Sequence, residues 1–158
     1  LPEWYLNPPK YDDKFVGVGD ALRPQFSLSK QVATERARVE VARAVETTVN
    51  SSLNDHMQAS GMGMEAGATE FTESVSKSLV STTLKGCTIE KTEIFKERVF
   101  VMVTYDAKKA RDEAKASARV LAKKEESLFN EFKARNAFDS LDKAIDRMKG
   151  SSSVAKPE

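Results

Sequence analysis

The alternation of apolar and polar residues predicts a strand over residues 14–21. Val16 and Val18 share one face of this segment, and Gly17 and Gly19 lie on the opposite face. Two glycines in one strand permit the backbone of a packed helix or of a neighbouring chain to approach closely. The later glycine of a dinucleotide-binding fingerprint is missing, so we do not expect a phosphate site here.

Residues 99–105 form the strongest predicted strand, because nearly all of them are apolar. A second strand is predicted at about 87–96, joined to the first by a tight turn at Glu97-Arg98. An apolar strand of this kind is expected to be covered on both faces, whereas one helix layer covers only one face of a small sheet. The second cover is then either the aromatic pair Trp4 and Tyr5 or another subunit.

Residues from about 27 to 53 have the spacing of an amphipathic helix, with Ser27 or Ser29 as its N-cap. Arg38 interrupts its apolar face and either reaches the edge of that face along its aliphatic stem or is buried and paired, for instance with a partner's carboxylate. The rest of the stripe is made of small and β-branched residues that suit close packing on a sheet: Ala33, Ala37, Val41, Ala44, Val45, Thr48 and Ser52.

Residues 54–69 contain three of the seven glycines and three of the five methionines. Glycine raises chain entropy and methionine adapts its shape, so we expect a mobile loop, or a methionine-lined contact that orders on assembly. His56 lies at the edge of this loop and is expected to be solvated. A short amphipathic helix is predicted over residues 70–81.

The segment from Asp106 to Lys149 has a helical pattern with two apolar faces. One straight helix cannot bury both faces against one surface. We therefore expect either a break near Arg135-Asn136, or one long helix that contacts different partners at its two ends. The first face contains Ala110, Ala114, Ala118, Leu121, Leu128 and Phe132, and the second contains Phe138, Leu141, Ile145 and Met148.

Together these elements predict an α+β fold in which a small antiparallel sheet is covered by a long helix, in the order β-α-α-β-β-α. The predicted divisions are a core at 1–106, a helical extension at 107–149 and a disordered tail at 150–158.

The N-terminal segment carries the only Trp and three of the five prolines. Asn7-Pro8-Pro9 is stiff and extended, because proline fixes its own φ and restricts the residue before it. Trp4 and Tyr5 supply a large amphipathic surface. This segment is either a lid on the domain's own core, a contact with a neighbouring subunit, or a platform that stacks on a ligand.

The composition of the chain argues against several classes of function. The chain has 158 residues, which fits one domain, and 25 basic against 24 acidic residues give a net charge of +1. This balance provides no general field for nucleic acid, so no nucleic-acid partner is expected. No apolar run is long enough for a transmembrane helix, and no signal peptide is visible.

Candidate catalytic chemistry is sparse. Cys87 is the only cysteine and His56 the only histidine, so neither a disulfide nor a Cys/His metal cluster can form within the chain. The carboxylates lie among lysines and arginines, away from the apolar settings that raise their pKa for acid catalysis. We expect no enzyme activity, no cofactor and no metal site.

Several segments together resemble the bacterial Lpp-twenty outer-membrane lipoprotein family, which includes flagellar basal-disk lipoproteins. The resemblance covers about residues 1–106 and does not explain the helix beyond Asp106. The segments that carry it are Pro2-Glu3-Trp4 with Asn7-Pro8-Pro9, Gly17-Val18-Gly19-Asp20-Ala21, Ala33 with Ala37-Arg38-Val39-Glu40-Val41-Ala42, and Arg98-Val99-Phe100-Val101-Met102-Val103-Thr104-Tyr105-Asp106.

The resemblance implies export to the periplasmic side of the outer membrane. It also implies an N-terminal lipid on a cysteine that this chain does not contain, expected to precede Leu1. Members of that family include surface antigens and lipoproteins that build a disk or ring around the flagellar motor. The family defines no catalytic residues, so none is carried over.

The leading hypothesis is therefore a non-enzymatic structural lipoprotein that self-assembles into a flagellum-associated disk or ring, with itself and other flagellar proteins as partners. The alternative is a monomeric, surface-exposed binding module or adhesin. A cytosolic coiled-coil adaptor that uses residues 107–149 is a third hypothesis. The candidate self-association residues are Trp4, Tyr5, Arg38, Phe100, Met102, Phe138, Leu141 and Ile145.

Overall fold

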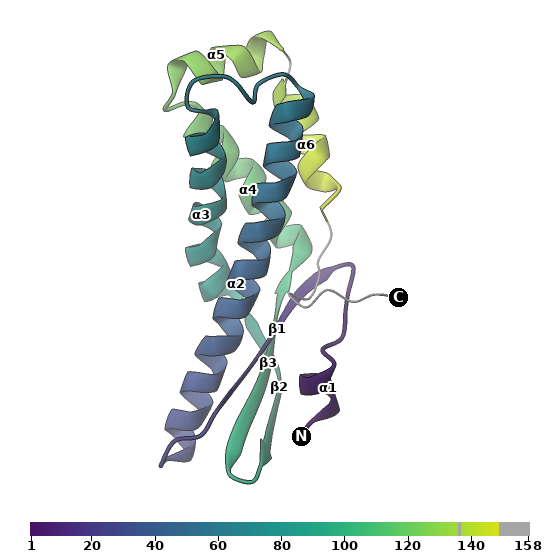
Figure 1. Ribbon diagram of the computed structural model, residues 1–158, viewed down its shortest axis with the longest axis vertical. Helices are drawn as coiled ribbons and strands as arrows, with labels where there is room; N and C mark the ends of the chain where they lie inside the picture. Colours follow the sequence, from purple (N-terminus) through teal and green to yellow (C-terminus); the bar gives the residue numbers. More distant parts are fainter. Residues whose placement is uncertain (136, 149–158) are drawn as a thin grey trace. The chain divides into compact units, whose positions relative to one another are not determined.

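The computed structural model describes residues 1–135 and 137–148, which form a three-stranded sheet and a set of helices (Figure 1). The described residues group into two compact units. Residues 1–44 and 81–108 form what we call the sheet unit, and residues 45–80 and 109–148 form the helical unit. The predicted α+β class, with a long helix against a small antiparallel sheet, is confirmed.

The two units do not follow the predicted division at residue 106. One border between them lies close to it, after Lys108, but residues 45–80 group with the C-terminal helices. The tail predicted at 150–158 lies outside the described residues.

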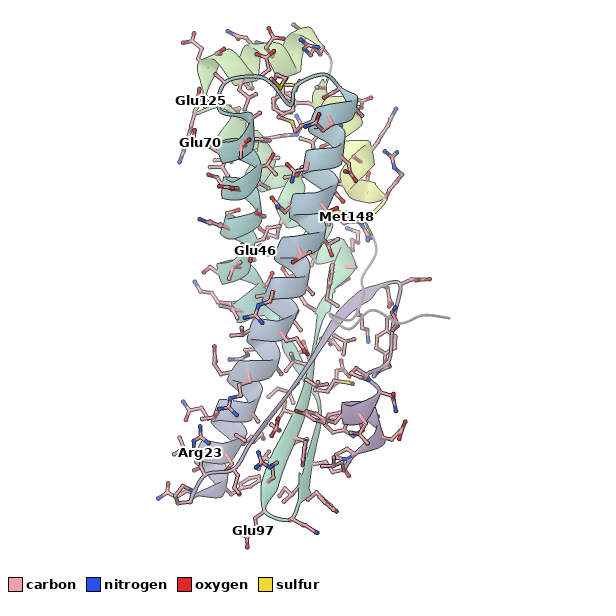
Figure 2. All side chains as sticks on the ribbon, viewed as in Figure 1. Arg23, Glu46, Glu70, Glu97, Glu125 and Met148 are labelled. Atoms are coloured by element: carbon pink, nitrogen blue, oxygen red, sulfur yellow. The ribbon has the colours of Figure 1, made fainter. Side chains whose placement is uncertain are left out.

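The sheet consists of β1 (Lys14–Ala21), β2 (Thr88–Phe95) and β3 (Arg98–Asp106). Its strand order is β1-β3-β2, and both pairings are antiparallel. The turn between β2 and β3 lies at Lys96 and Glu97, one residue before the predicted position. Both residues have positive φ, which matches the twist of a two-residue hairpin, and Figure 2 labels Glu97 at its tip.

One face of the sheet is covered by α2 (Phe26–Ala59), whose residues up to Ala44 belong to the sheet unit. Gly17 and Gly19 make this contact possible. A Cβ on Gly19 would lie 2.7 Å from the backbone nitrogen of Ala37, and a Cβ on Gly17 would lie 2.6 Å from a methyl carbon of Val41. The helix therefore packs directly on the backbone of β1.

The other face of the sheet is covered by the short helix α1 (Glu3–Leu6). The Tyr5 ring meets the Phe100 ring edge-on, with centroids 4.9 Å apart. In Figure 1, α1 and α2 lie on opposite sides of the strands. As a result, β3 is buried from Val99 to Tyr105, with no residue of that segment more than 5 % exposed.

The helical unit contains the second part of α2, most of α3 (Ala68–Gly86) and α4 (Ala107–Ala122), together with α5 (Glu126–Ala134) and α6 (Ala137–Asp146). Phe132 stacks on Phe138 with centroids 4.6 Å apart and also meets Phe71. The remaining large side chains of its core are Val45, Val49, Leu53, Met57, Met62, Val75, Leu79, Leu128, Leu141, Ile145 and Met148.

Three boundaries in this unit differ from or refine the prediction. Helix α2 continues to Ala59, so the predicted loop starts later. Met57 in the helix and Met62 after it are both buried. A break that the pattern did not predict separates α4 from α5. The break predicted near Asn136 is present, because α5 ends at Ala134 and α6 begins at Ala137.

Replacing Gly19 by alanine tests the close packing of α2 on β1. The added methyl would overlap backbone atoms of α2, so we expect Gly19→Ala to lower the free energy of unfolding by about 3 kcal/mol. Urea denaturation measures this change. Gly63→Ala is the matched control, since its methyl would meet only the movable side chain of Gln58. An equal loss in both variants would contradict the close approach.

Candidate functional site

Four of the predicted self-association residues are buried within the single chain. Phe100, Met102, Leu141 and Ile145 are each no more than 2 % exposed. Of the two covers expected for the second face of β3, the aromatic pair or another subunit, the structure shows the first, since Tyr5 packs on Phe100. Both covers come from this chain, because α2 takes one face of the sheet and Tyr5 packs against Phe100 on the other.

Trp4 and Tyr5 form a lid, which is the first of the three interpretations of the N-terminal segment. The Tyr5 hydroxyl donates a hydrogen bond to the Asp20 carboxylate, which also accepts one from Arg98 at 2.7 Å. Trp4 Nε1 donates to Glu93 at 3.1 Å. Burial, and then the hydrogen bond to Asp20, raise the pKa of Tyr5 to about 12. The lid is thus held by the contact of Tyr5 with Phe100 and by two hydrogen bonds, from Tyr5 to Asp20 and from Trp4 to Glu93.

The other two predicted residues have local partners. Arg38 is half-exposed, and its guanidinium lies 3.7 Å from Glu35, although its Nε has no hydrogen-bond partner among the described residues. Phe138 stacks within the helical unit, and the Arg119 guanidinium lies 5.0 Å from its ring centroid. Of the eight predicted residues, the structure brings Tyr5, Trp4 and Phe100 into contact.

The outer edge of β1 is closed by side chains of α2. The Val18 N–H donates to Glu40 Oε1 at 2.6 Å, and the Asp20 carbonyl accepts a hydrogen bond from Arg36 at 2.8 Å. Exposed N–H and C=O groups at a sheet edge can pair with another strand. Here the helix that covers β1 also occupies backbone groups along that edge.

The outer edge of β2 is different, because β2 ends the sheet and every one of its eight residues is exposed. Ile94 is 54 % exposed, and Ile89 and Phe95 are each 41 % exposed. Three large apolar side chains on an open edge strand form a surface that another strand could cover. No other described strand pairs with the outer side of β2. We call residues 88–95, with this outer side, the β2 edge, and take it as the candidate functional site.

Sequence reasoning missed the β2 edge, since the mixed polarity of these residues is typical of any half-buried strand. The available signal was the count of apolar residues. Ile89, Ile94 and Phe95 are too few for a covered strand and more than a solvated edge needs.

Cys87 and His56, the only cysteine and the only histidine of the chain, each have contacts within their own unit. The Cys87 thiol donates to the Thr83 carbonyl at 3.2 Å, and burial raises its pKa to about 11, so it is a poor nucleophile at neutral pH. His56 is buried rather than solvated as expected, because α2 extends through it. Burial lowers its pKa, while a hydrogen bond to the Ala137 backbone acts in the opposite direction. The two residues belong to different units.

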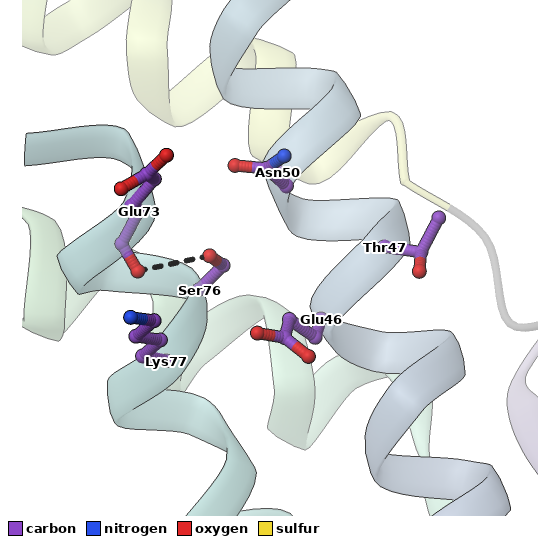
Figure 3. Close-up of a pocket in the computed structure, with 6 residues that line it drawn as sticks. All are labelled: Glu46, Thr47, Asn50, Glu73, Ser76 and Lys77. Atoms are coloured by element: carbon purple, nitrogen blue, oxygen red, sulfur yellow. Dashed lines mark hydrogen bonds between the residues drawn. The ribbon is translucent and has the colours of Figure 1, made fainter. Parts of the chain in front are cut away.

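A pocket of about 350 Å³ lies between α2 and α3 in the helical unit (Figure 3). Asn50 and Glu73 point toward one another across it, and the buried Asn50 Oδ1 has no hydrogen-bond partner among the described residues. Nowhere in residues 1–135 and 137–148 do three or more His, Cys, Asp or Glu side chains gather as a metal site would require. The residues that line the pocket between α2 and α3 are Glu46, Thr47, Asn50, Glu73, Ser76 and Lys77.

Within the described residues, none of the helices combines the length and the apolar character needed to cross a membrane. Neither the known protein families nor the curated proteins contain a match to this sequence.

Replacing Tyr5 by phenylalanine tests the lid. The variant keeps the ring on Phe100 but loses the hydrogen bond to Asp20, so we expect it to be less stable by about 1 kcal/mol near neutral pH. A raised pKa means that folding favours protonated Tyr5. The wild type should therefore lose stability relative to Tyr5→Phe as the pH rises from 10.0 to about 12. Urea denaturation across this range measures both effects, and a constant difference between the proteins would contradict the contact.

Proposed function

We propose that this chain is a non-enzymatic structural protein that associates with copies of itself through the β2 edge. The observation that carries the proposal is the contrast between the two edges of the sheet. Side chains of α2 form hydrogen bonds with backbone groups at the outer edge of β1, whereas β2 is exposed at all eight positions.

Strand addition is the mode of association that this surface favours. A strand that pairs with an exposed sheet edge gains backbone hydrogen bonds, and its side chains supply specificity. A second strand beside β2 would also remove Ile89, Ile94 and Phe95 from water. Fully burying an exposed side chain of this size contributes about 1.5 to 3 kcal/mol, and these three, already about half-buried, would gain the remaining part.

The cellular part of the proposal rests on the resemblance to the Lpp-twenty family. The resemblance implies a position on the periplasmic side of the outer membrane, with an N-terminal lipid on a cysteine that this chain does not contain. There it would take part in a disk or ring associated with the flagellum, with other flagellar proteins as further partners. Two of the segments that carry the resemblance form β1 and β3, so it concerns the same sheet that bears the β2 edge.

A monomeric binding module is the second candidate, and the pocket between α2 and α3 favours it. The unpartnered Asn50 Oδ1 and the two carboxylates of Glu46 and Glu73 could receive a ligand with hydrogen-bond donors. In that case a ligand would stabilise the protein, and protein concentration would not.

Sedimentation velocity over a range of protein concentrations tests the proposal. We expect the wild type to associate as concentration rises, and Ile94→Asp to weaken that association about tenfold, because it places a charge on the β2 edge. Val120→Asp is the matched control, since Val120 is 58 % exposed and lies in α4.

A wild-type protein that stays monomeric at all concentrations, with and without lipid vesicles, would contradict self-association. Equal weakening by Ile94→Asp and Val120→Asp would contradict the assignment to the β2 edge.

A further inference from the structure

The hydrogen bonds at the outer edge of β1 show, through the alternation of the strand pairs, which backbone groups of β2 point outward. Because the Val18 N–H bonds to Glu40, its backbone groups point away from β3, whose residue opposite Val18 is Met102. Residues of an antiparallel pair alternate between the two sides, so the backbone groups of Met102 point toward β2.

The alternation continues across the sheet into β2. Met102 and Phe100 stand opposite Lys91 and Glu93, which therefore bond to β3. Thr92 lies between these two residues, so its N–H and C=O point to the outer side of β2, as do those of Ile94. The β2 edge thus presents donors and acceptors in antiparallel spacing.

The side chains of β2 divide between the two faces of the sheet. Val103, Val101 and Val99 stand opposite Gly17, Gly19 and Ala21 on the face that α2 covers. Their partners in β2 on that face are Ile89, Thr92 and Ile94. The opposite face carries Thr88, Lys91, Glu93 and Phe95.

A bulge makes the pattern of β2 symmetric. The register shifts between Ile89 and Lys91, so Glu90 is an extra residue, and its carboxylate accepts a hydrogen bond from the Thr104 hydroxyl at 3.0 Å. With Glu90 left out, the α2 face has the order Ile, Thr, Ile, which is the same in both directions. On the other face, reversal exchanges Lys91 with Glu93 and Thr88 with Phe95.

We propose that the β2 edge pairs with the β2 edge of a second copy of this chain. The two strands are antiparallel, and the two-fold axis that relates them passes between the two Thr92 residues. The outward backbone groups of the two Thr92 residues bond to one another. Lys91 of each copy then stands opposite Glu93 of the other, and Ile89 stands opposite Ile94. Opposite charges and apolar side chains in such cross-strand positions stabilise a pair of strands.

Charge selects this register over its neighbours. A two-fold axis at Glu93 would set two carboxylates directly opposite one another, and an axis at Lys91 would do the same with two ammonium groups. Like charges directly opposite are destabilising. Lys91 and Glu93 therefore oppose indiscriminate pairing of the exposed edge and permit the one arrangement in which they complement each other.

This inference rests on the proposed self-association and specifies its geometry. A two-fold pair closes on itself, so a disk or ring would be built from such pairs through a further, different contact.

Charge reversal provides the test by sedimentation velocity on the full chain. Lys91→Glu and Glu93→Lys each create two like-charge pairs across the axis, and each variant alone should dimerise at least about tenfold more weakly than the wild type. Because Glu93→Lys also removes the acceptor of the Trp4 Nε1 hydrogen bond, recovery in the mixture, and not the loss in that variant alone, decides the test. An equimolar mixture of the two variants restores both opposite-charge pairs, so we expect a mixed dimer within about threefold of the wild-type affinity. Lys123→Glu and Glu113→Lys, exposed positions in the helical unit, are the matched controls.

Disulfide cross-linking in a Cys87→Ser background gives a second measurement. Thr92→Cys should form a disulfide dimer, because its copies meet at the axis. Ile94→Cys alone should not, since its copies lie too far apart for a disulfide, but mixed with Ile89→Cys it should form a mixed dimer.

Failure of the inference and failure of the proposed function are distinguishable. If the wild type associates but charge reversal and mixing leave its affinity unchanged, the two-fold β2 pairing is overturned and self-association stands. A preparation of the wild type that is monomeric throughout would overturn both.

Discussion

The direct contact of α2 with the backbone of β1 is the constraint on which the sheet unit depends. Gly17 and Gly19 have no side chains, so α2 lies directly against the backbone of β1. A Cβ at either position would overlap atoms of α2. This contact buries one face of β3, and Tyr5 on Phe100 buries the other. The most apolar strand, β3, is therefore covered by residues of its own chain. The exposed strand of the sheet is β2.

The same helix makes the two edges of the sheet unequal. Arg36 and Glu40 reach past β1 to bond its outward carbonyl and N–H groups, and this closes one edge. β2 lies at the other end of the sheet, and its exposed isoleucines and alternating charges are left on the surface. A strand that has both hydrogen-bonding capacity and apolar area is suited to pairing, and its symmetric pattern suits pairing with a copy of itself.

Local pattern was enough to predict β1, β3 and the long helix α2, and it offered the break between α5 and α6 as one of two alternatives. It could not show what covers β3, because Phe100 does not reveal whether its neighbour is Tyr5 of the same chain or a residue of another. It also placed His56 in solvent, since the helix continues six residues beyond the predicted end near Leu53, to Ala59. The candidate site was missed for a related reason. Whether Ile94 is exposed depends on the position of β2 in the sheet, which is a property of the whole unit and not of the strand's own residues.

Amide hydrogen exchange at the outward-facing positions of β2 tests the central claim most directly. If the β2 edge pairs with a second copy, the Thr92 and Ile94 amides exchange more slowly as protein concentration rises, while the Val18 amide, already bonded to Glu40, keeps a constant rate. Exchange at Thr92 and Ile94 that stays fast and independent of concentration, across a range in which the chain associates, would contradict the claim.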